Sequence, residues 1–297
     1  MLSRTYSYNA HSNASQVREG QVHTGLMDID NKVAVVTGAA GGIGRALAAE
    51  LARRGAYKVA LVDRTECVAT AAQELNHEVG RVVGVPFSGD VTDADFRRHV
   101  FDSVTADNGP VTICVPAAGI TRDDLTVRLD KTTGDARIYP EETFRLVVDV
   151  NLIAPVYWVL EMVARIAQDR HRRGIARWRP EEDVQGVGIL IGSVSSQGNK
   201  GQISYATTKA GLHGAAATLM KEAIFYGVRC ALIHPGYTDT PMVQALGQDF
   251  IARNILPYTQ LGRLIRPDEI ADAICFMISN SAVSGELWAD AGWHPPA

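Results

Sequence analysis

Residues 33–44, with the sequence VAVVTGAAGGIG, decide the fold. The run from Val33 to Thr37 is almost wholly apolar, as expected for a strand of a parallel sheet that is covered by helices on both faces. The glycines that follow form a tight turn, and helical spacing begins at its end. Such a turn lets the backbone approach a pyrophosphate, which then lies at the positive end of the helix. A turn without a ligand is the alternative that the glycines alone leave open.

Apolar runs and helical patterns alternate along the rest of the chain. The seven apolar runs are Val33–Thr37, Val59–Val62, Val82–Val85, Thr112–Val115, Gly188–Ile191, Cys230–Ile233 and Glu286–Ala289. Helical spacing covers residues 44–54 and 205–226, and each segment ends near a glycine. We therefore predict an α/β fold, a single-domain doubly wound Rossmann fold whose seven-stranded parallel sheet is flanked by helices.

The expected domain covers residues 30–297, and residues 1–29 are expected to be a disordered N-terminal arm. The first 26 residues are polar and rich in Ser, Asn and His. An upstream start codon, with Met27 as the functional beginning, is an alternative for them, and an organelle transit peptide is a weaker one.

Two segments interrupt the alternation of strands and helices. Residues 129–142 are expected to form a polar surface loop, and residues 168–186 extend a helix end with clustered arginines before the sequence turns acidic. The cluster consists of Arg170, Arg172, Arg173, Arg177 and Arg179. We interpret it as a solvated, partly self-paired face, with a site for a CoA or carrier phosphate as the alternative.

Composition excludes several classes of function. The chain is 46% hydrophobic and 21% charged, as in globular proteins. Its net charge of -4 gives no general attraction to nucleic acids or anionic membranes, so neither is an expected partner. No apolar stretch reads as a membrane span and none as a secretory signal, so we expect a cytoplasmic protein. The four cysteines are widely spaced and look like reduced thiols, and no metal site is expected.

Asp63 at the end of the second apolar run indicates which dinucleotide the turn would bind. It follows Gly44 by 19 residues, close to the offset at which an acid meets the adenosine ribose hydroxyls. A carboxylate there accepts hydrogen bonds from the ribose diol and repels the extra phosphate of NADP. NAD is therefore favoured, and NADP stays open because Arg64 could reach a 2′-phosphate. A capping or turn aspartate is the alternative role for Asp63.

Tyr205 and Lys209 are candidates for proton transfer. They lie four residues apart near the start of a helix, so their side chains share one face. We expect the ammonium to lower the pKa of the phenol, so that Tyr205 can give a proton to a carbonyl oxygen or take one from an alcohol. Such pairs are also common on helix surfaces.

Ser193 follows the fifth strand, at the edge of the sheet where ligands collect. Its hydroxyl can donate a hydrogen bond to the substrate oxygen. Ser195 and Ser196 are rivals for that role, or turn-forming hydroxyls.

These motifs together resemble the short-chain dehydrogenase/reductase family from about Lys32 to Trp293. The similarity is greatest to its 3-oxoacyl-acyl-carrier-protein reductase members. The motifs are Thr37–Gly44, Asp63, Asp90-Val91, Ala118-Gly119, Asn151, Ser193, Tyr205, Lys209, Pro235-Gly236 and Thr240. The resemblance implies an NAD(P)-dependent oxidoreductase that moves a hydride between the nicotinamide and a carbonyl or secondary alcohol. It also implies a homotetramer or homodimer, assembled through the helices that carry Asn151 and Tyr205.

The resemblance also implies roles for individual residues. The catalytic residues would be Asn151, Ser193, Tyr205 and Lys209, with Asn151 holding a water that connects Lys209 to solvent. Asp90 would hydrogen-bond the adenine and Val91 would flank it. Pro235 and Gly236 would run along the nicotinamide, with Thr240 near its carboxamide. The full cofactor-binding set would be Gly38, Gly42, Ile43, Gly44, Asp63, Arg64, Asp90, Val91, Ala118, Gly119, Tyr205, Lys209, Pro235, Gly236, Thr238 and Thr240.

The sequence departs from the family pattern at three places. The usual Asn-Asn-Ala-Gly is here Pro116-Ala117-Ala118-Gly119, without the two side-chain amides that brace this region. Gly41 stands where NADP-preferring relatives often carry a basic residue, which agrees with NAD. Residues 225–227, Phe-Tyr-Gly, stand where carrier-protein reductases present an arginine to the acidic carrier, which weakens the fatty-acid assignment.

Two other functions therefore remain open. One is an NAD-dependent sugar or cyclic-alcohol dehydrogenase, because the two interrupting segments remodel the surroundings of the cleft. The other is a non-catalytic dinucleotide-sensing scaffold, although a sensor needs no proton relay. His234 and Trp293 are interpreted as packing groups, with a place at the substrate cleft as the alternative.

Overall fold

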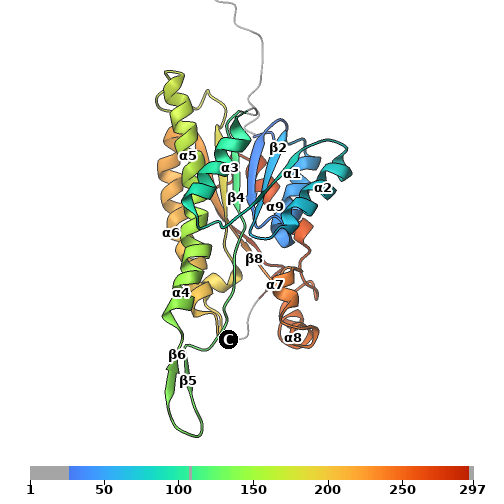
Figure 1. Ribbon diagram of the computed structural model, residues 1–297, viewed down its shortest axis with the longest axis vertical. Helices are drawn as coiled ribbons and strands as arrows, with labels where there is room; N and C mark the ends of the chain where they lie inside the picture. Colours follow the sequence, from blue (N-terminus) through green and yellow to red (C-terminus); the bar gives the residue numbers. More distant parts are fainter. Residues whose placement is uncertain (1–26, 107–108, 294–297) are drawn as a thin grey trace, which may run out of the picture.

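The computed structural model describes residues 27–106 and 109–293 and is centred on one parallel sheet (Figure 1). The seven strands lie in the order β3-β2-β1-β4-β7-β8-β9. They are β1 Val33–Thr37, β2 Lys58–Asp63, β3 Gly84–Ser88, β4 Ile113–Pro116, β7 Gly186–Ile191, β8 Val228–Pro235 and β9 Gly285–Ala289. The predicted doubly wound sheet is confirmed. Because the strand order reverses between β1 and β4, a crevice opens there at the carboxyl ends of the strands.

Helices cover both faces of the sheet (Figure 1). On one face lie α1 Gly42–Arg53, α2 Cys67–Val79 and α9 Pro267–Ser279; on the other lie α3 Ala94–Thr105, α4 Glu141–Val148, α5 Ala154–Arg172 and α6 Ile203–Glu222. Successive side chains of a strand point to opposite faces, so Ala34 and Val36 pack on the first layer and Val33 and Val35 on the second. Burial on both faces explains why β1 has no polar alternation.

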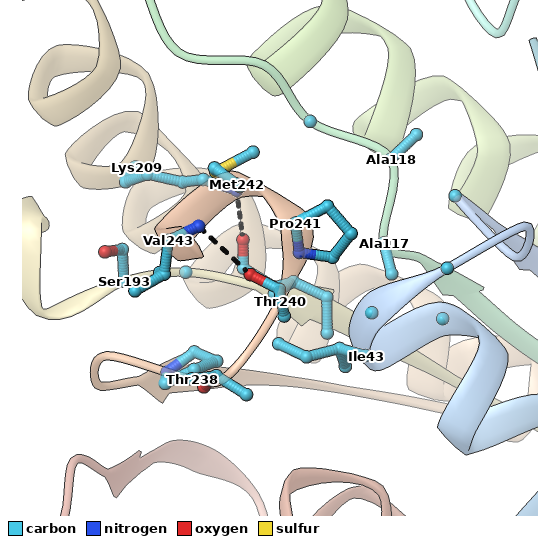
Figure 2. Close-up of a pocket in the computed structure, with 18 of the residues that line it drawn as sticks. Ile43, Ala117, Ala118, Ser193, Lys209, Thr238, Thr240, Pro241, Met242 and Val243 are labelled. Carbon is cyan, nitrogen blue, oxygen red and sulfur yellow. Dashed lines mark hydrogen bonds between the residues drawn. The ribbon is translucent and has the colours of Figure 1, made fainter. Parts of the chain in front are cut away.

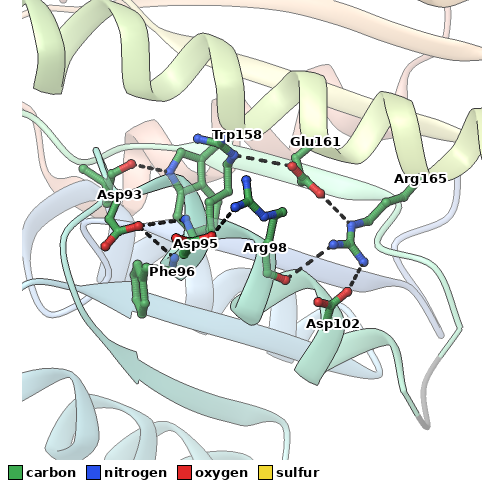
Figure 3. Close-up of polar contacts among 10 residues, drawn as sticks. Asp93, Asp95, Phe96, Arg98, Asp102, Trp158, Glu161 and Arg165 are labelled. Atoms are coloured by element: carbon green, nitrogen blue, oxygen red, sulfur yellow. Dashed lines mark hydrogen bonds and ion pairs between the residues drawn. The ribbon is translucent and has the colours of Figure 1, made fainter.

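Polar side chains cap α3 and join it to α5, which lies on the same face of the sheet (Figure 3). Asp93 caps α3, because its carboxylate accepts hydrogen bonds from the backbone N–H groups of Asp95 at 2.7 Å and Phe96 at 3.1 Å. At the other end of α3, Asp102 accepts a 2.6 Å hydrogen bond from Arg165 of α5. The cap stabilises the start of α3, and the ion pair joins the other end of α3 to α5.

α4 and α5 run on through a π-helical turn, η1 Asp149–Ile153, as one helix of 32 residues, Glu141–Arg172. By length and composition this helix could cross a membrane, so the expectation that no segment reaches that length is wrong. It nevertheless buries Trp158 and Met162 completely against the sheet. Core helices of sheet proteins pass the same test of length and composition, and the packing of this helix is that of a core helix.

The prediction of a polar loop at residues 129–142 is wrong in part. An antiparallel hairpin begins just before this segment and continues into it. β5 Val127–Leu129 pairs with β6 Ala136–Ile138, and the hairpin projects from the rest of the protein (Figure 1). On one face Arg128 and Arg137 both bind the carboxylate of Asp124, at 2.6 and 2.7 Å. Val127 and Ile138 pair across the strands on the other face and remain exposed. The two arginines, one from each strand, thus bind the same carboxylate and help to hold together two strands of only three residues each.

The base of this hairpin is joined to the start of α6. The backbone N–H of Asp124 donates to the carbonyl oxygen of Gly201 at 2.9 Å. The hydroxyl of Tyr139 lies 2.9 Å from that of Ser204 in the first turn of α6. The hairpin therefore begins and ends beside the helix that carries Tyr205 and Lys209.

The arginine cluster is not uniformly solvated. Arg170 is 1% exposed, and its guanidinium donates to both carboxylate oxygens of Glu182, at 2.7 and 3.2 Å. These hydrogen bonds hold the pKa of Glu182 below its usual range. The expectation of a solvated face is therefore wrong for Arg170, because the acidic part of the same segment folds back and neutralises it. Arg173 remains at the surface, where it pairs with Asp169 at 2.9 Å.

The boundary expected for the N-terminal arm is also wrong. Residues 1–26 lie outside the described part of the chain. Met27 and Ile29 are buried, and the backbone N–H of Met27 donates to the carbonyl oxygen of Ser279 at 2.8 Å. Residues 27–29 thus pack at the end of α9 instead of belonging to an arm.

Candidate active site

The glycine turn after β1 is closed so tightly that a side chain would not fit at two positions. A Cβ on Gly44 would lie 2.3 Å from the carbonyl oxygen of Gly38, and one on Gly38 would lie 2.8 Å from the backbone nitrogen of Ala118. Gly38 and Gly42 have φ angles of +67° and +54°, which favour glycine. No side chain caps the N-terminus of α1, so its backbone N–H groups stay available to a ligand, as a pyrophosphate site requires.

Two adjoining hollows form the cleft, with volumes of about 310 and 250 Å³. In Figure 2 Ser193 and Lys209 lie on one side of the first hollow, and Ile43 and Ala117 lie on the other. The first hollow contains the predicted residues Gly38, Gly42, Ile43, Gly44, Asp63, Ala118, Gly119, Ser193, Tyr205, Lys209, Pro235, Gly236, Thr238 and Thr240. The second hollow adds Arg64, Asp90 and Val91. Every predicted cofactor residue therefore lines the cleft, and the individual roles stay predictions.

Asp63 lies where the two hollows meet and joins the end of β2 to the glycine turn. One carboxylate oxygen accepts a hydrogen bond from the backbone N–H of Ala40 at 3.1 Å. The other accepts from the backbone N–H and the hydroxyl of Thr65, both at 3.1 Å. The bonds orient the carboxylate and leave lone pairs for a further donor. A side chain on Gly41 would meet nothing within 4 Å, so the absence of a basic group there is not imposed by packing.

The second hollow ends at Asp90 and Val91. Hydrogen bonds from the backbone N–H and the hydroxyl of Thr92, at 2.9 and 2.7 Å, hold the pKa of the Asp90 carboxyl below its usual range. The carbonyl oxygen of Val91 accepts a 2.9 Å hydrogen bond from the indole nitrogen of Trp158 on α5. This end of the cleft is thus fixed to the helical layer, with an ionised carboxylate beside it.

The segment that lacks the usual asparagines is braced by other bonds. Thr37 at the end of β1 accepts a hydrogen bond through its hydroxyl from the backbone N–H of Ala118, at 3.0 Å. Pro116 remains in β4 and is paired with Thr37 in the sheet register. The backbone therefore keeps a place beside the glycine turn without the two amides.

Tyr205 and Lys209 both face the first hollow from the start of α6. The Nζ atom of Lys209 donates to the carbonyl oxygen of Ile191 at 2.7 Å and lies 5.5 Å from the centre of the Tyr205 ring. Ser193 lies close enough to Tyr205 for its hydroxyl to lower the pKa of the phenol. One cleft therefore contains a phenol, a hydroxyl and an amine within reach of one another.

Ser193 differs from its two rivals in where it lies. Only Ser193 of the three is among the residues described as lining the first hollow. Ser195 is buried, and its backbone N–H donates to the hydroxyl oxygen of Ser193 at 3.1 Å. The hydroxyl of Ser196 lies 3.4 Å from Nδ1 of His234. The geometry thus favours Ser193 for contact with a substrate oxygen.

The electrostatics differ from those expected. Burial raises the pKa of Tyr205 to about 12, against a smaller lowering by the hydrogen bond from Ser193. Burial also lowers the pKa of Lys209 to about 8. The expected lowering of the phenol pKa is therefore wrong, because the loss of water around the buried phenol is the largest effect on its pKa and raises it. Tyr205 consequently stays protonated at neutral pH, as a proton donor requires.

Asn151 lies in the π-helical turn and is completely buried. Its amide binds the backbone of Ile120 twice: Nδ2 donates to the carbonyl oxygen at 2.8 Å, and Oδ1 accepts from the N–H at 2.9 Å. Asn151 and Lys209 approach Gly119 from the same direction, because a Cβ built there would lie 3.4 Å from Oδ1 and 3.9 Å from Nζ. The side chain braces the cleft wall, and its role in holding a water stays a prediction.

Sequence reasoning missed a group of hydrogen-bonded polar side chains near Tyr205. Gln202 donates to the carboxylate of Asp123 at 2.8 Å, and Asn199 donates to the side-chain oxygen of Gln202 at 3.1 Å and to the hydroxyl of Tyr237 at 3.3 Å. Asp123 and Tyr237 are close enough to Tyr205 to raise its pKa slightly. No sequence motif predicts this group, because its members come from three separate loops.

Sequence reasoning also missed the short helix over the first hollow, α7 Pro241–Gln244. Pro241, Met242 and Val243 line the hollow (Figure 2). Thr240 caps this helix, since its hydroxyl accepts from the backbone N–H of Val243 at 3.4 Å. The pair Thr240-Pro241 was the available signal, because threonine favours the cap and proline the first helical position.

The family of the chain follows from comparison with known proteins. Residues 32–250 match the short chain dehydrogenase family. The chain belongs to that family. As a short-chain dehydrogenase it is an oxidoreductase that acts on CH–OH groups and their carbonyl counterparts with NAD(P).

Several relatives of this short-chain dehydrogenase match along most of its length. The 3-oxoacyl-acyl-carrier-protein reductase FabG of Escherichia coli is 34% identical, over 88% of this chain and 96% of its own. The acetoacetyl-CoA reductase of Allochromatium vinosum is 31% identical, over 84% and 92%. The (3R)-3-hydroxyacyl-CoA dehydrogenase of Canis lupus familiaris is 30% identical, over 84% and 90%. The solved structure of gox2181 is 28% identical, with a TM-score of 0.73 over 89% of this chain and 95% of that one.

Proposed function

We propose that this short-chain dehydrogenase interconverts 3-oxoacyl and 3-hydroxyacyl thioesters and prefers NAD to NADP. The observation that carries the proposal is the convergence of Ser193, Tyr205 and Lys209 on the hollow that begins at the glycine turn. The names of the relatives support the substrate class, since three of them act on 3-oxoacyl or 3-hydroxyacyl groups held by a carrier protein or CoA.

The residues divide the proton transfer between them. The bound nicotinamide supplies the hydride in reduction and accepts it in oxidation. Tyr205 donates its phenolic proton to the substrate oxygen, and the hydroxyl of Ser193 donates a hydrogen bond to the same oxygen. Lys209, charged below a pKa of about 8, stabilises the phenolate that remains. A phenol with its pKa at about 12 is protonated at neutral pH, which suits the reductive direction.

The proposed preference for NAD rests on the charges of the residues where the two hollows meet. Asp63 lines both hollows, Gly41 adds no cation, and Arg64 is exposed and lines the second hollow. A carboxylate accepts hydrogen bonds from a ribose diol and repels a 2′-phosphate. We expect kcat/KM for NADH to exceed that for NADPH by at least about tenfold, the ratio that corresponds to about 1.4 kcal/mol. Equal values for the two cofactors would refute the assignment.

The activity is tested with purified protein, NADH and a panel of acetoacetyl-CoA, a cyclic ketone and a keto sugar. Turnover of acetoacetyl-CoA supports the proposal. Tyr205→Phe should lower kcat by about 10²- to 10⁴-fold, the usual contribution of a general acid, and should leave NADH binding unchanged. Tyr57→Phe is the matched control, because Tyr57 is exposed outside the cleft, and it should keep full activity. Full activity of Tyr205→Phe would refute the mechanism.

A second candidate, an NAD-dependent sugar or cyclic-alcohol dehydrogenase, is favoured by the polar side chains near Tyr205. Asp123, Asn199 and Gln202 offer donors and acceptors that a polyhydroxylated substrate could use. If this candidate holds, Asp123→Ala should raise KM for the sugar about tenfold and leave kcat unchanged, as expected when one substrate hydroxyl loses its partner. Tight NADH binding without turnover of any substrate would favour the non-catalytic scaffold instead.

A homotetramer or homodimer in the cytoplasm completes the proposal. Its support is the outer side of the helix that carries Asn151, where Leu146, Ile153, Tyr157 and Leu160 are exposed. Buried apolar area is what a stable subunit interface needs. Mass photometry at nanomolar concentration should show two or four copies, and a monomer would contradict the assembly. Cell fractionation would test the location.

A further inference from the structure

An imidazole lies behind the loop that carries Ser193, outside the two hollows. His234, near the end of β8, is 1% exposed. Its ring stacks on that of Trp288 in β9, with the centres 4.1 Å apart and an angle of 12° between the planes. Its Nε2 atom lies 2.9 Å from a carboxylate oxygen of Glu286, also in β9. A polar ring this deeply buried is costly unless both nitrogens have partners.

The partners define which nitrogen carries the proton in the neutral ring. A carboxylate only accepts hydrogen bonds, so Nε2 must donate to Glu286. Nδ1 of the neutral ring is then an acceptor. It lies 3.4 Å from the backbone nitrogen of Ser193 and 3.4 Å from the hydroxyl oxygen of Ser196, and both groups can donate to it. The carbonyl oxygen of Ser193, which can only accept, is also near Nδ1, at 3.2 Å. The ring therefore connects a charged residue of β9 to the backbone of the Ser193 loop.

Packing reinforces this connection. A Cβ on Gly192 would lie 2.5 Å from Nδ1 of His234, so the backbone before Ser193 rests directly on the imidazole. The hydroxyl of Ser193 in turn lies close enough to Tyr205 to lower the pKa of the phenol, and both residues line the first hollow. A change in the position of the ring would therefore move the backbone of Ser193 and, through its hydroxyl, the contact with Tyr205.

Glu286 also contacts the helix on which Tyr205 lies. Its second carboxylate oxygen pairs with Nδ1 of His213 in α6, whose side chain is 64% exposed. Glu286 is thus the common partner of one ring below the Ser193 loop and one at the surface of α6. Of these two rings only that of His234 reaches the cleft residues.

We propose that His234 is a positioning residue for Ser193, oriented by Glu286. It touches neither substrate nor cofactor. It acts by holding the backbone of Ser193 in the position from which the serine hydroxyl reaches the substrate oxygen and Tyr205. The inference rests on the proton-transfer role proposed for Ser193 and Tyr205. Misplacement of a catalytic group by about 1 Å can cost about 10²-fold in rate, so a residue of this kind should influence kcat more than binding.

Two amide variants separate the two nitrogens of the ring. His234→Asn places an amide near the position of Nδ1 and keeps a partner for the Ser193 loop, but it does not reach Glu286. His234→Gln reaches toward Glu286 but leaves nothing at the position of Nδ1. If His234 positions Ser193, the Gln variant should lose about 10- to 100-fold in kcat while the Asn variant stays within about fivefold of the wild type. KM for NADH should change less than twofold in both.

The controls distinguish positioning from simple support of the fold. Thermal unfolding of both variants is measured beside kcat, because a merely structural role predicts that activity falls in step with stability in both. His213→Gln removes the other partner of Glu286 and should leave kcat within twofold. Glu286→Ala removes the acceptor that orients the ring and should lower kcat several-fold; it provides the test if neither His234 variant folds.

Three outcomes would overturn the inference. Wild-type kcat in His234→Gln, equal losses in the two amide variants, or wild-type kcat in Glu286→Ala would each show that the ring does not position Ser193. Wild-type protein that binds NADH and turns over nothing on the panel would instead refute the proposed function, and the positioning role with it. The first three results leave the proposed function standing.

Discussion

Replacing Lys209 by methionine should make the protein more stable while it abolishes turnover. Burial lowers the pKa of this lysine from 10.5 to about 8. One pKa unit is worth about 1.4 kcal/mol, so keeping the charge buried below pH 8 costs about 3 kcal/mol of folding free energy. The variant loses the hydrogen bond to the carbonyl oxygen of Ile191, worth about 1 kcal/mol. At pH 7 the net gain in the free energy of unfolding should therefore be about 2 kcal/mol.

The gain should disappear as the pH rises. The unfolded chain binds the proton of Lys209 up to its ordinary pKa of 10.5, whereas the folded protein releases it at about 8. The cost to the wild type is therefore complete below pH 8 and absent above 10.5, so its stability rises relative to the variant in that window. Urea unfolding followed by circular dichroism at pH 7, 8.5 and 9.5 measures the difference. Near pH 9.5 the two proteins should be about equally stable.

Lys221→Met is the matched control for this experiment. Lys221 lies on the same helix and is exposed, so its replacement should change the free energy of unfolding by less than about 0.5 kcal/mol at each pH. A Lys209→Met variant that is less stable than the wild type at pH 7, or whose advantage does not change with pH, would refute the reasoning. It would show that the charge of Lys209 is better solvated than its burial implies.

Three further perturbations test the cleft and its support. Gly44→Ala should abolish NADH binding, measured by fluorescence titration, because its Cβ would collide with Gly38, whereas Gly41→Ala has open space and should bind within twofold of the wild type; equal losses would contradict the tight turn. Asp63→Ala combined with Gly41→Arg should raise the ratio of kcat/KM for NADPH over NADH by about 10²-fold, and an unchanged ratio would mean that Asp63 does not face the adenosine ribose. Glu182→Ala leaves Arg170 charged in the interior without its carboxylate partner, so the urea midpoint should fall, and an unchanged midpoint would mean that water reaches the guanidinium.

The sheet could be predicted from sequence where strands are buried on both faces. β1 and β8 are continuous apolar runs, and their burial throughout explains why the pattern located them. β3 begins two residues later than the predicted run and extends to Ser88, since it is an edge strand with exposed positions and carries Pro86. The hairpin was missed because strands of three residues give too little alternation to recognise.

The site could be located but not its electrostatics. The glycine turn, Asp63 and Ser193 lie at the carboxyl ends of β1, β2 and β7 of one parallel sheet, so the topology brings them to one edge of that sheet. The pKa of Tyr205 depends on how much water the folded chain excludes, which no local pattern reports. The burial of Arg170 was missed for a related reason, because its partner comes from the far side of a loop.

The β5–β6 hairpin gives this enzyme two regions with different tolerance of change. Its base is tied to the turn before Tyr205 through Asp124 and Tyr139, whereas residues 130–135 at its tip project away from the protein (Figure 1). Lengthening or shortening the tip leaves the phenol where it is, and the same alteration at the base displaces it. The tip is consequently the place to graft a peptide epitope or a fluorescent label onto an active enzyme, and a label placed at the base would instead sense events around the phenol.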